Sequence, residues 1–547
     1  MRHSTACAAC RNRRRKCLVP PDGGICAYCS DQNIACLRAG SIHRPGSGGS
    51  IRPRPPTTTT TTSPTHLSHG QPPIPPSPRR PLPADIPDKA LTFDLVELYF
   101  TYIHDQFHSL FHRPSFILDL HRGCAPPVIV YAMLALSARF STHPFFDGIP
   151  PTTRGEHFAF KSNALLNLRE ISVTTIQACV LLGAAAIVEG EAAAESVFYA
   201  AAARIANYLD LPNLPVESVL EREVNLRVYW TLCMIDVWSS AGINLPREMT
   251  RRDNVPYPMD EAVFLSLTSS SPDPATSNRK YSLLAQMIKL NGILLSINDA
   301  IKTLTSPEGD AANFSSSTVP TLSARLEVWE AALPPNLRDT PENLHFHASQ
   351  GLGRIFVAIY LGYYHFGQLL FYPYLDELQR QSRSPSSSSS PPTYTSPAPS
   401  QPHASSYAKR CKHFASSLSR IVSTANATPG CDVRYNMVGH ITVVSSSVFI
   451  HTLLFSSSQP ELDVARRQLE QNFEVLTGLR TYWPMLEVCF ARLRTFHALC
   501  RRSMDTSFRM DRWMVRFLTE FARPVGEGER EGELGVGEGW WDVEGEG

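Results

Sequence analysis

The stretch CAACRNRRRKCLVPPDGGICAYCSDQNIAC, residues 7 to 36, decides how the N-terminal part of this chain folds. Its spacing is C-x2-C-x6-C-x8-C-x2-C-x6-C, which is one cysteine unit used twice. Two thiolates about one helical turn apart face the same way, so each C-x2-C pair can clamp a metal ion. Soft sulfur ligands favour zinc, and six thiolates serve two four-coordinate ions only if two of them bridge. The spacing therefore predicts two Zn(II) ions per chain, held by Cys7, Cys10, Cys17, Cys26, Cys29 and Cys36.

The charge of the chain is distributed very unevenly. The 547 residues carry 51 basic and 50 acidic side chains, a formal charge of +1, which by itself excludes a uniformly basic nucleic-acid coat protein. Residues 1–83 nevertheless carry +10, and residues 524–547 carry −7. Five of the basic residues lie between the second and third cysteines, in the run Arg11-Asn12-Arg13-Arg14-Arg15-Lys16. This asymmetry indicates nucleic acid as the partner of one end and protein as the partner of the other.

The cysteines and the basic run resemble the fungal Zn(II)2Cys6 binuclear-cluster transcription factors, whose zinc module binds the DNA major groove. Pro20 and Pro21 also lie in the loop where that family commonly has a proline. The resemblance implies two short helices around the cluster, with Cys7 and Cys26 as the bridging ligands. Cys10 and Cys17 would then complete one zinc site, and Cys29 and Cys36 the other.

The same resemblance implies how DNA is read. Arg13 and Arg14 occupy the family's base-reading positions, while Arg11, Arg15 and Lys16 are placed to contact phosphates. Arginine suits guanine because its fork can bond O6 and N7 together, so a CGG-like triplet is expected. The family usually has lysine at the position of Arg14 and often an apolar residue at that of Arg15, which leaves the triplet open.

We therefore expect a nuclear, zinc-dependent, sequence-specific regulator of RNA polymerase II transcription. The alternative from another class is a thiolate cluster that senses metal or redox state without sequence-specific DNA binding. A third interpretation takes the basic run as a solvated nuclear import signal only.

Two composition changes divide the chain. Residues 41–83 form a Pro/Thr-rich linker that includes six consecutive threonines, 57–62, and has too few apolar residues to pack. The predicted parts are a DNA-binding domain at 1–40, this disordered linker, an all-helical middle homology domain at 84–523 and an acidic tail at 524–547. The linker has no heptads, so the chain either binds one triplet as a monomer or forms a homodimer through its body.

The acidic tail contains Trp540 and Trp541. Acidic residues that keep aromatic groups accessible are typical of disordered activation segments, so transcription coactivators are candidate partners of this tail. An inert solvated tail is the alternative.

The body is predicted to be all-α, with a Ser/Pro-rich disordered insert at about 381–406. Helical periodicity indicates helices at 128–141, 173–188, 192–208, 221–240, 279–303, 322–332, 352–380, 407–424, 437–455, 461–502 with a break near Pro484, and 507–522. Two blocks resemble the fungal-specific middle homology region: Leu95, Leu98, Tyr99, Phe100, His104 and His112 to Phe116, then Arg227, Trp230, Asp236, Pro246, Asp253 and Pro256. The resemblance implies a regulatory domain, with a ligand pocket among its helices as a hypothesis.

Other functions find little support in the sequence. His104, His108 and His112 recur every four residues, a spacing that could place them on one helical stripe and form a metal site, but a core or surface role is favoured because Pro114 ends the helix nearby. No H-E-x-x-H, G-x-S-x-G or Walker motif occurs, so no enzyme is predicted. The seven scattered cysteines are expected to be buried mostly. The opening residues lack a secretion signal's apolar core, and no membrane span is expected.

Overall fold

The computed structural model describes residues 88–502, with gaps at 107, 274–278, 307–308 and 376–403, together with Phe521 and Ala522. In the N-terminal region it describes residues 17, 26, 29, 36–38 and 41–43. The contacts divide the chain into two units, Met1–Arg79 and Arg80–Gly547. We call the described part of the second unit the helical body.

The described part of the first unit contains a small antiparallel hairpin. Strand β1 (Cys36–Arg38) pairs with β2 (Ser41–His43), and Cys36 lies opposite His43. The sequence did not predict these strands. The two short helices expected around the zinc cluster fall almost entirely outside the described residues, where Cys29 alone is assigned helical conformation.

The helical body confirms the all-α prediction. Its helices are α3 (Lys89–Tyr102), α4 (Arg113–Arg122), α5 (Pro127–Ser137), α6 (Glu156–Leu165), α7 (Val173–Val188), α8 (Ala192–Tyr208), α9 (Val219–Ile243), α10 (Glu261–Leu265), α11 (Leu283–Leu304), α12 (Ala311–Asn313), α13 (Val319–Ala331), α14 (Pro341–Ser349), α15 (Gly353–Phe371), α17 (Ala404–Ala427), α18 (Met437–Phe455), α19 (Gln459–Arg480) and α20 (Leu486–Arg502). A π-helical turn, Phe314–Thr318, joins α12 to α13. Short 3-10 turns lie at Ala138–Phe140, Pro144–Phe146, Pro151–Thr153, Leu211–Asn213, Arg279–Tyr281, Pro335–Leu337 and Tyr372–Tyr374.

Local sequence sets the ends of the long helix α9. Ser218 and Glu221 form a capping box, in which each side chain accepts a hydrogen bond from the other's backbone N–H. At the other end Asn244 adopts left-handed backbone geometry, with φ of 54°, and its N–H bonds back to the last turn. Such a residue satisfies carbonyls that have no partner within the helix. The helix therefore spans the 25 residues between two side-chain-encoded signals.

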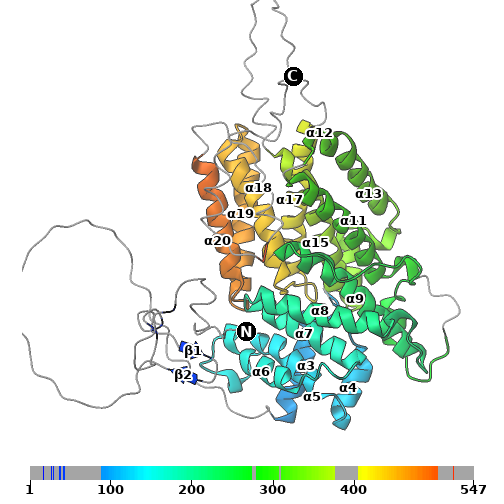
Figure 1. Cartoon of the computed structure of the whole chain (residues 1–547). Helices are drawn as coiled ribbons and strands as arrows, with labels where there is room; N and C mark the ends of the chain where they lie inside the picture. The colour runs from blue at the N-terminus through cyan, green and yellow to red at the C-terminus, as the bar shows by residue number, and fades with distance from the viewer. Residues whose placement is uncertain are drawn as a thin grey trace, which may run out of the picture. The chain divides into compact units, whose positions relative to one another are not determined.

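One continuous core joins the first and last helices of the body. Most buried apolar residues from Leu91 to Phe521 belong to one cluster, and a small second cluster consists of Leu220, Met259, Phe264 and Leu267. Figure 1 shows α7, α8 and α9 close together in the lower half of the body, and α17, α18 and α20 as neighbouring upright helices above α7 and α8. The backbone N–H of Met485 donates to the carbonyl of Val188 at 3.2 Å. Segments almost 300 residues apart in sequence therefore fold together as one body.

Two core helices are long and apolar enough to cross a membrane by length and composition alone. They are Gly353–Tyr374, which contains α15, and Met437–Phe455, which is α18. A bent pair, Arg113–Arg122 with Pro127–Phe140, passes the same test only if it counts as one broken span. The apolar windows of the two long helices are 89% and 83% buried inside the body, against neighbouring helices. Their apolar side chains therefore form part of the protein core. From the sequence, no helix was expected to pass this length and composition test.

Candidate functional site

The six predicted zinc ligands are only partly described. Cys17 is half-buried, Cys26 and Cys29 are buried, and Cys36 is the first residue of β1. Cys7, Cys10, the basic residues Arg11, Arg13, Arg14, Arg15 and Lys16, and the tail residues Trp540 and Trp541 lie outside the described residues. Within the described parts of the chain, no group of three or more His, Cys, Asp and Glu side chains is placed to hold a metal ion. Cys26 and Cys29, buried and three residues apart, still have the chemistry of a thiolate clamp.

The cysteines of the helical body differ from these in chemistry. Cys179, Cys411, Cys431, Cys489 and Cys500 are buried and Cys233 is half-buried, as the sequence predicted for most of them, whereas Cys124 is exposed. Burial raises the pKa of Cys179 and of Cys489 to about 12. A metal ligand must be the thiolate, which such a pKa disfavours at neutral pH. The five buried cysteines of the body are therefore core residues, and the N-terminal six remain the candidate ligands.

The two sequence blocks that resemble the middle homology region meet in the core. The backbone N–H of Ser109 donates to Oγ1 of Thr231 at 3.0 Å, and that hydroxyl donates back to the carbonyl of Ser109 at 3.2 Å. The side chain of Gln177 on α7 donates to the carbonyl of Leu110 at 2.7 Å. The segment between α3 and α4 is thereby fixed against α7 and α9. This is a structural role, because each of these polar groups is satisfied within the core.

Arg227 on α9 is the centre of a buried charged network. Its Nη2 donates to the carbonyl of Met259 at 2.9 Å, and its guanidinium lies 3.9 Å from the ring centre of Phe264. Glu223, one turn earlier, lies 3.5 Å from Arg227 and 2.8 Å from Arg279. Glu223 also accepts the N–H of Met259 at 2.7 Å. These contacts hold the segment between α9 and α11 in one conformation.

Two further residues of the second block hold the loop after α9 in place. Nε1 of Trp230 donates to the carbonyl of Pro256 at 2.9 Å. The carboxylate of Asp236 accepts the N–H groups of Glu248 and Met249 at 2.9 and 3.0 Å. Arg227, Trp230 and Asp236 of the second block therefore brace the loop after α9.

The three histidines spaced every four residues do not form a helical stripe, so that geometric prediction is wrong. Helix α3 ends at Tyr102, and Asp105 takes left-handed geometry with φ of 62°. Nε2 of His104 accepts the N–H groups of Leu110 and Phe111, both at 3.1 Å. A reversal of the chain at Asp105 therefore replaces the continuous helix that the spacing suggested.

The other two histidines of the set also have core roles. Nδ1 of His112 caps α4 by accepting the N–H of Ser115 at 3.4 Å. Burial is the main cause that lowers the pKa of His108 to about 3, so this imidazole stays neutral. The core interpretation of these histidines agrees with their burial, since each is at most 5% exposed.

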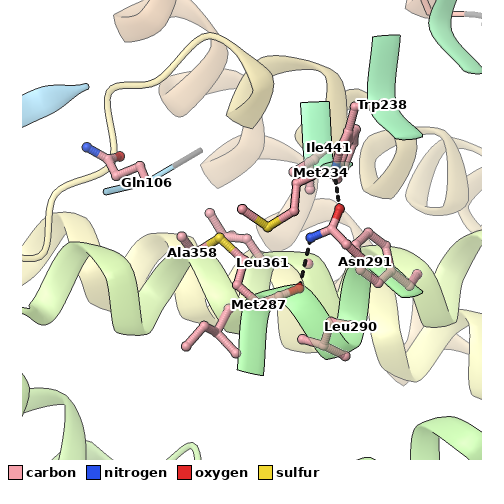
Figure 2. Close-up of a pocket in the computed structure, with 12 residues that line it drawn as sticks. Gln106, Met234, Trp238, Met287, Leu290, Asn291, Ala358, Leu361 and Ile441 are labelled. Atoms are coloured by element: carbon pink, nitrogen blue, oxygen red, sulfur yellow. Dashed lines mark hydrogen bonds between the residues drawn. The ribbon is translucent and has the colours of Figure 1, made fainter. Parts of the chain in front are cut away.

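A small apolar cavity lies between α9, α11, α15 and α18. Figure 2 shows Met234 and Met287 on its walls and Asn291 hydrogen-bonded to both Trp238 and the main chain of Met287, each at 2.9 Å. Its volume is about 30 Å³, whereas sites for small ligands are typically about 300–1,000 Å³. A shallow polar hollow of about 400 Å³ opens to solvent between α17 and α19. Neither hollow supports the hypothesis of a metabolite pocket in the core.

Comparison with known proteins shows what the helical body is similar to. Residues 96–331 match the fungal specific transcription factor domain. The chain is 25% identical over 469 residues to an uncharacterised transcriptional regulatory protein of Schizosaccharomyces pombe, which covers 73% of the chain and 47% of that relative. It is also 25% identical over 460 residues to a Zn(2)-C6 fungal-type transcription factor of Fusarium oxysporum, with 75% and 46% covered. The chain thus spans about half the length of these curated relatives.

Proposed function

We propose that this chain, which belongs to the fungal Zn(2)-C6 transcription factors, regulates transcription by binding DNA through its N-terminal zinc cluster. The family and the relatives are transcription factors and not enzymes, in agreement with the absence of catalytic motifs noted in the sequence. The observation that carries the proposal is the repeated C-x2-C-x6-C unit with its internal basic run, joined to a fungal specific transcription factor domain. Nuclear localisation follows from that role.

The proposed ligand scheme assigns two zinc ions to the cluster, with Cys7 and Cys26 as bridging ligands. When bound, zinc supplies the folding free energy that so short a segment lacks, which for zinc-finger peptides is about 10–16 kcal/mol. Cys10 and Cys17 complete one site, and Cys29 and Cys36 the other. The positive residues around the cluster partly offset its net negative charge.

Zinc content tests this scheme directly. Cys7→Ala removes a ligand of both ions, so the full-length variant should lose both, whereas Cys36→Ala should retain part of its zinc. Cys124→Ala is the matched control, because Cys124 is exposed and lies in the helical body. The measurement is native mass spectrometry of the purified chain, and equal zinc loss from the Cys7 and Cys36 variants would refute the bridging assignment.

In the proposed DNA complex, Arg13 and Arg14 contact base edges and Arg11, Arg15 and Lys16 contact phosphates. A bidentate arginine contributes about 1–3 kcal/mol of discrimination against the wrong base. Arg13→Ala should therefore lower affinity for a CGG-containing duplex about 10-fold or more while leaving weak binding to unrelated DNA nearly unchanged. Arg52→Ala, in the linker, is the control variant for fluorescence anisotropy. Equal loss on both duplexes would favour the alternative of a thiolate sensor that binds DNA without sequence preference.

The tail and the body have separate proposed roles. Residues 524–547, with Trp540 and Trp541, would bind coactivators, and the helical body would restrain or tune activity and provide any homodimer contact. Fusing 524–547 to an unrelated DNA-binding domain should activate a reporter, and replacing both tryptophans by alanine should abolish that activation. A silent fusion would leave the tail as an inert solvated segment.

A further inference from the structure

Gly242, in the last turn of α9, leaves room for an aromatic ring from the far end of the chain. A Cβ atom at this position would lie 2.8 Å from Cζ of Phe521 and 3.0 Å from its Cε2, closer than real carbon contacts. Phe521 is 7% exposed, so its ring has little freedom to move away. Any residue with a side chain at position 242 would therefore push the ring out.

A backbone hydrogen bond fixes the same contact. The N–H of Ala522 donates to the carbonyl of Gly242 at 3.0 Å. The last four carbonyls of a helix have no partner within the helix, and Gly242 is the residue before the final one of α9. The C-terminal segment thus supplies a capping donor to α9 as well as a ring.

Aromatic side chains from two helices complete the recess. The ring of His440 on α18 lies 4.3 Å from that of Phe521, centre to centre, and Trp238 on α9 meets it edge-on at 6.4 Å. His365 on α15 stacks on Trp238 at 5.6 Å and contacts His440 at 5.4 Å. Burial, together with His365 and Arg492, lowers the pKa of His440 well below its usual value, so the imidazole is neutral against the ring. We call Gly242, Trp238 and His440 the aromatic socket.

We propose that the aromatic socket is a docking site for an aromatic side chain, and that its natural occupant is Phe521, which anchors the C-terminal segment to the helical body. Three independent features meet there: a glycine that makes space, a capping hydrogen bond and an aromatic lining. The first acid of the tail, Glu527, follows Phe521 by six residues. The anchor therefore fixes Phe521 and Ala522 against α9 and α18, shortly before the acidic tail begins in the sequence, whether or not the tail activates transcription.

Loss of the ring should open a site that a free aromatic molecule can fill. Phe521→Ala in the full-length chain should lower the thermal unfolding midpoint by roughly 3 °C or more. Toluene at millimolar concentration should raise the midpoint of this variant, as small aromatic compounds fill engineered apolar cavities, and should leave the unaltered chain unchanged. Phe160→Ala is the matched control, because Phe160 is 69% exposed. An unchanged midpoint in Phe521→Ala, or no selective effect of toluene, would overturn the proposal.

A second variant tests the socket from the other side. Gly242→Ala should expel the ring and accelerate hydrogen exchange in the peptide that contains residues 521–523, at least several-fold. Gly478→Ala on α19 is the control, because nothing lies within 4 Å of a Cβ built there. Exchange in 521–523 that is the same in Gly242→Ala and in the unaltered chain would show that the socket does not hold this segment.

Discussion

At the residue scale, the buried guanidinium of Arg227 ties α9 to the segment that precedes α4 and to the segment that precedes α10. Glu223 is a local partner, four residues earlier on the same helix, but no local pattern shows that Arg227 also donates to Met259 and Ser109. Those partners are set by tertiary packing. The expected helical stripe of His104, His108 and His112 does not form for the same reason. The chain reversal at Asp105 depends on contacts with α9 that the four-residue spacing cannot reveal.

Removal of the Arg227 charge should destabilise the body strongly. In Arg227→Met, Glu223 keeps Arg279 but loses one buried partner, and the carbonyl of Met259 loses its donor. Breaking a buried ion pair from one side typically costs about 3–5 kcal/mol, so about 3 kcal/mol is expected here. Arg113→Ala, which breaks an exposed pair with Glu97, should cost less than about 1 kcal/mol. Chemical denaturation of both variants checks this, and equal costs would contradict the network.

Glu195 on α8 predicts a specific pH dependence of stability. Burial raises its pKa to about 8, and the hydrogen bond with the Ser239 side chain only partly opposes the shift. An unfolded glutamate loses its proton near pH 4.3, so between about pH 4 and pH 8 the folded state holds a proton that the unfolded state lacks. The contribution of Glu195 to the free energy of unfolding therefore falls as pH rises through that window.

The variant Glu195→Gln should not show this fall in the free energy of unfolding, because glutamine does not titrate. Its thermal midpoint should exceed that of the unaltered chain at pH 8, and the difference should shrink toward pH 5. Glu170→Gln serves as the control, since Glu170 is exposed. A difference for Glu195→Gln that does not change between these two pH values would disprove the assignment.

At the element scale, the sequence predicted α7, α8 and α18 with the bounds that the structure has, because their apolar runs end at clear signals such as Gly190 and Ser456. The predicted break near Pro484 is confirmed by the separation of α19 from α20. The π-helical turn at Phe314–Thr318 and the hairpin β1–β2 were missed, since neither has a periodic signature. The predicted helix at 507–522 lies outside the described residues except for its last two.

The α7–α8 pair depends on a glycine in the middle of a helix. A Cβ at Gly183 would lie 2.3 Å from Cε1 of Tyr199 on α8. Gly183→Ala should therefore lower the free energy of unfolding by about 1–3 kcal/mol through overpacking. Gly478→Ala, where the Cβ meets open space, should instead raise it by about 0.5–1 kcal/mol because alanine favours the helix. Urea denaturation compares the two, and a stabilised Gly183→Ala would contradict this packing.

At the scale of the whole molecule, the near-zero charge of the chain arises mainly because a basic N-terminal region, residues 1–83, is offset by an acidic tail, residues 524–547. We call residues 1–83 the basic head. The candidate DNA contacts follow from the family resemblance, which could be recognised from sequence because cysteine spacing and a basic run are local signals. The aromatic socket could not be predicted from sequence, since it joins residues of α9 and α18 to Phe521. Local chemistry can be predicted from sequence, whereas contacts between distant segments depend on the fold.

The salt dependence of DNA affinity should be set by the phosphate contacts of the basic head and not by the net charge of the chain. Three phosphate contacts from Arg11, Arg15 and Lys16 predict a slope of log K against log salt concentration of about −3. Deleting residues 524–547 should leave that slope unchanged within error. Titrations of a single duplex at several salt concentrations measure it. A slope that steepens markedly after the deletion would show that the tail competes for the basic head.

Zinc-dependent, sequence-specific DNA binding can be measured by binding-site selection from random duplexes, using the full-length chain with zinc and with a chelator. We expect enrichment of a CGG-like triplet in zinc, single or paired, and loss of that enrichment in chelator. Enrichment that persists without zinc, or zinc-dependent binding with no preferred sequence, would contradict the proposed function.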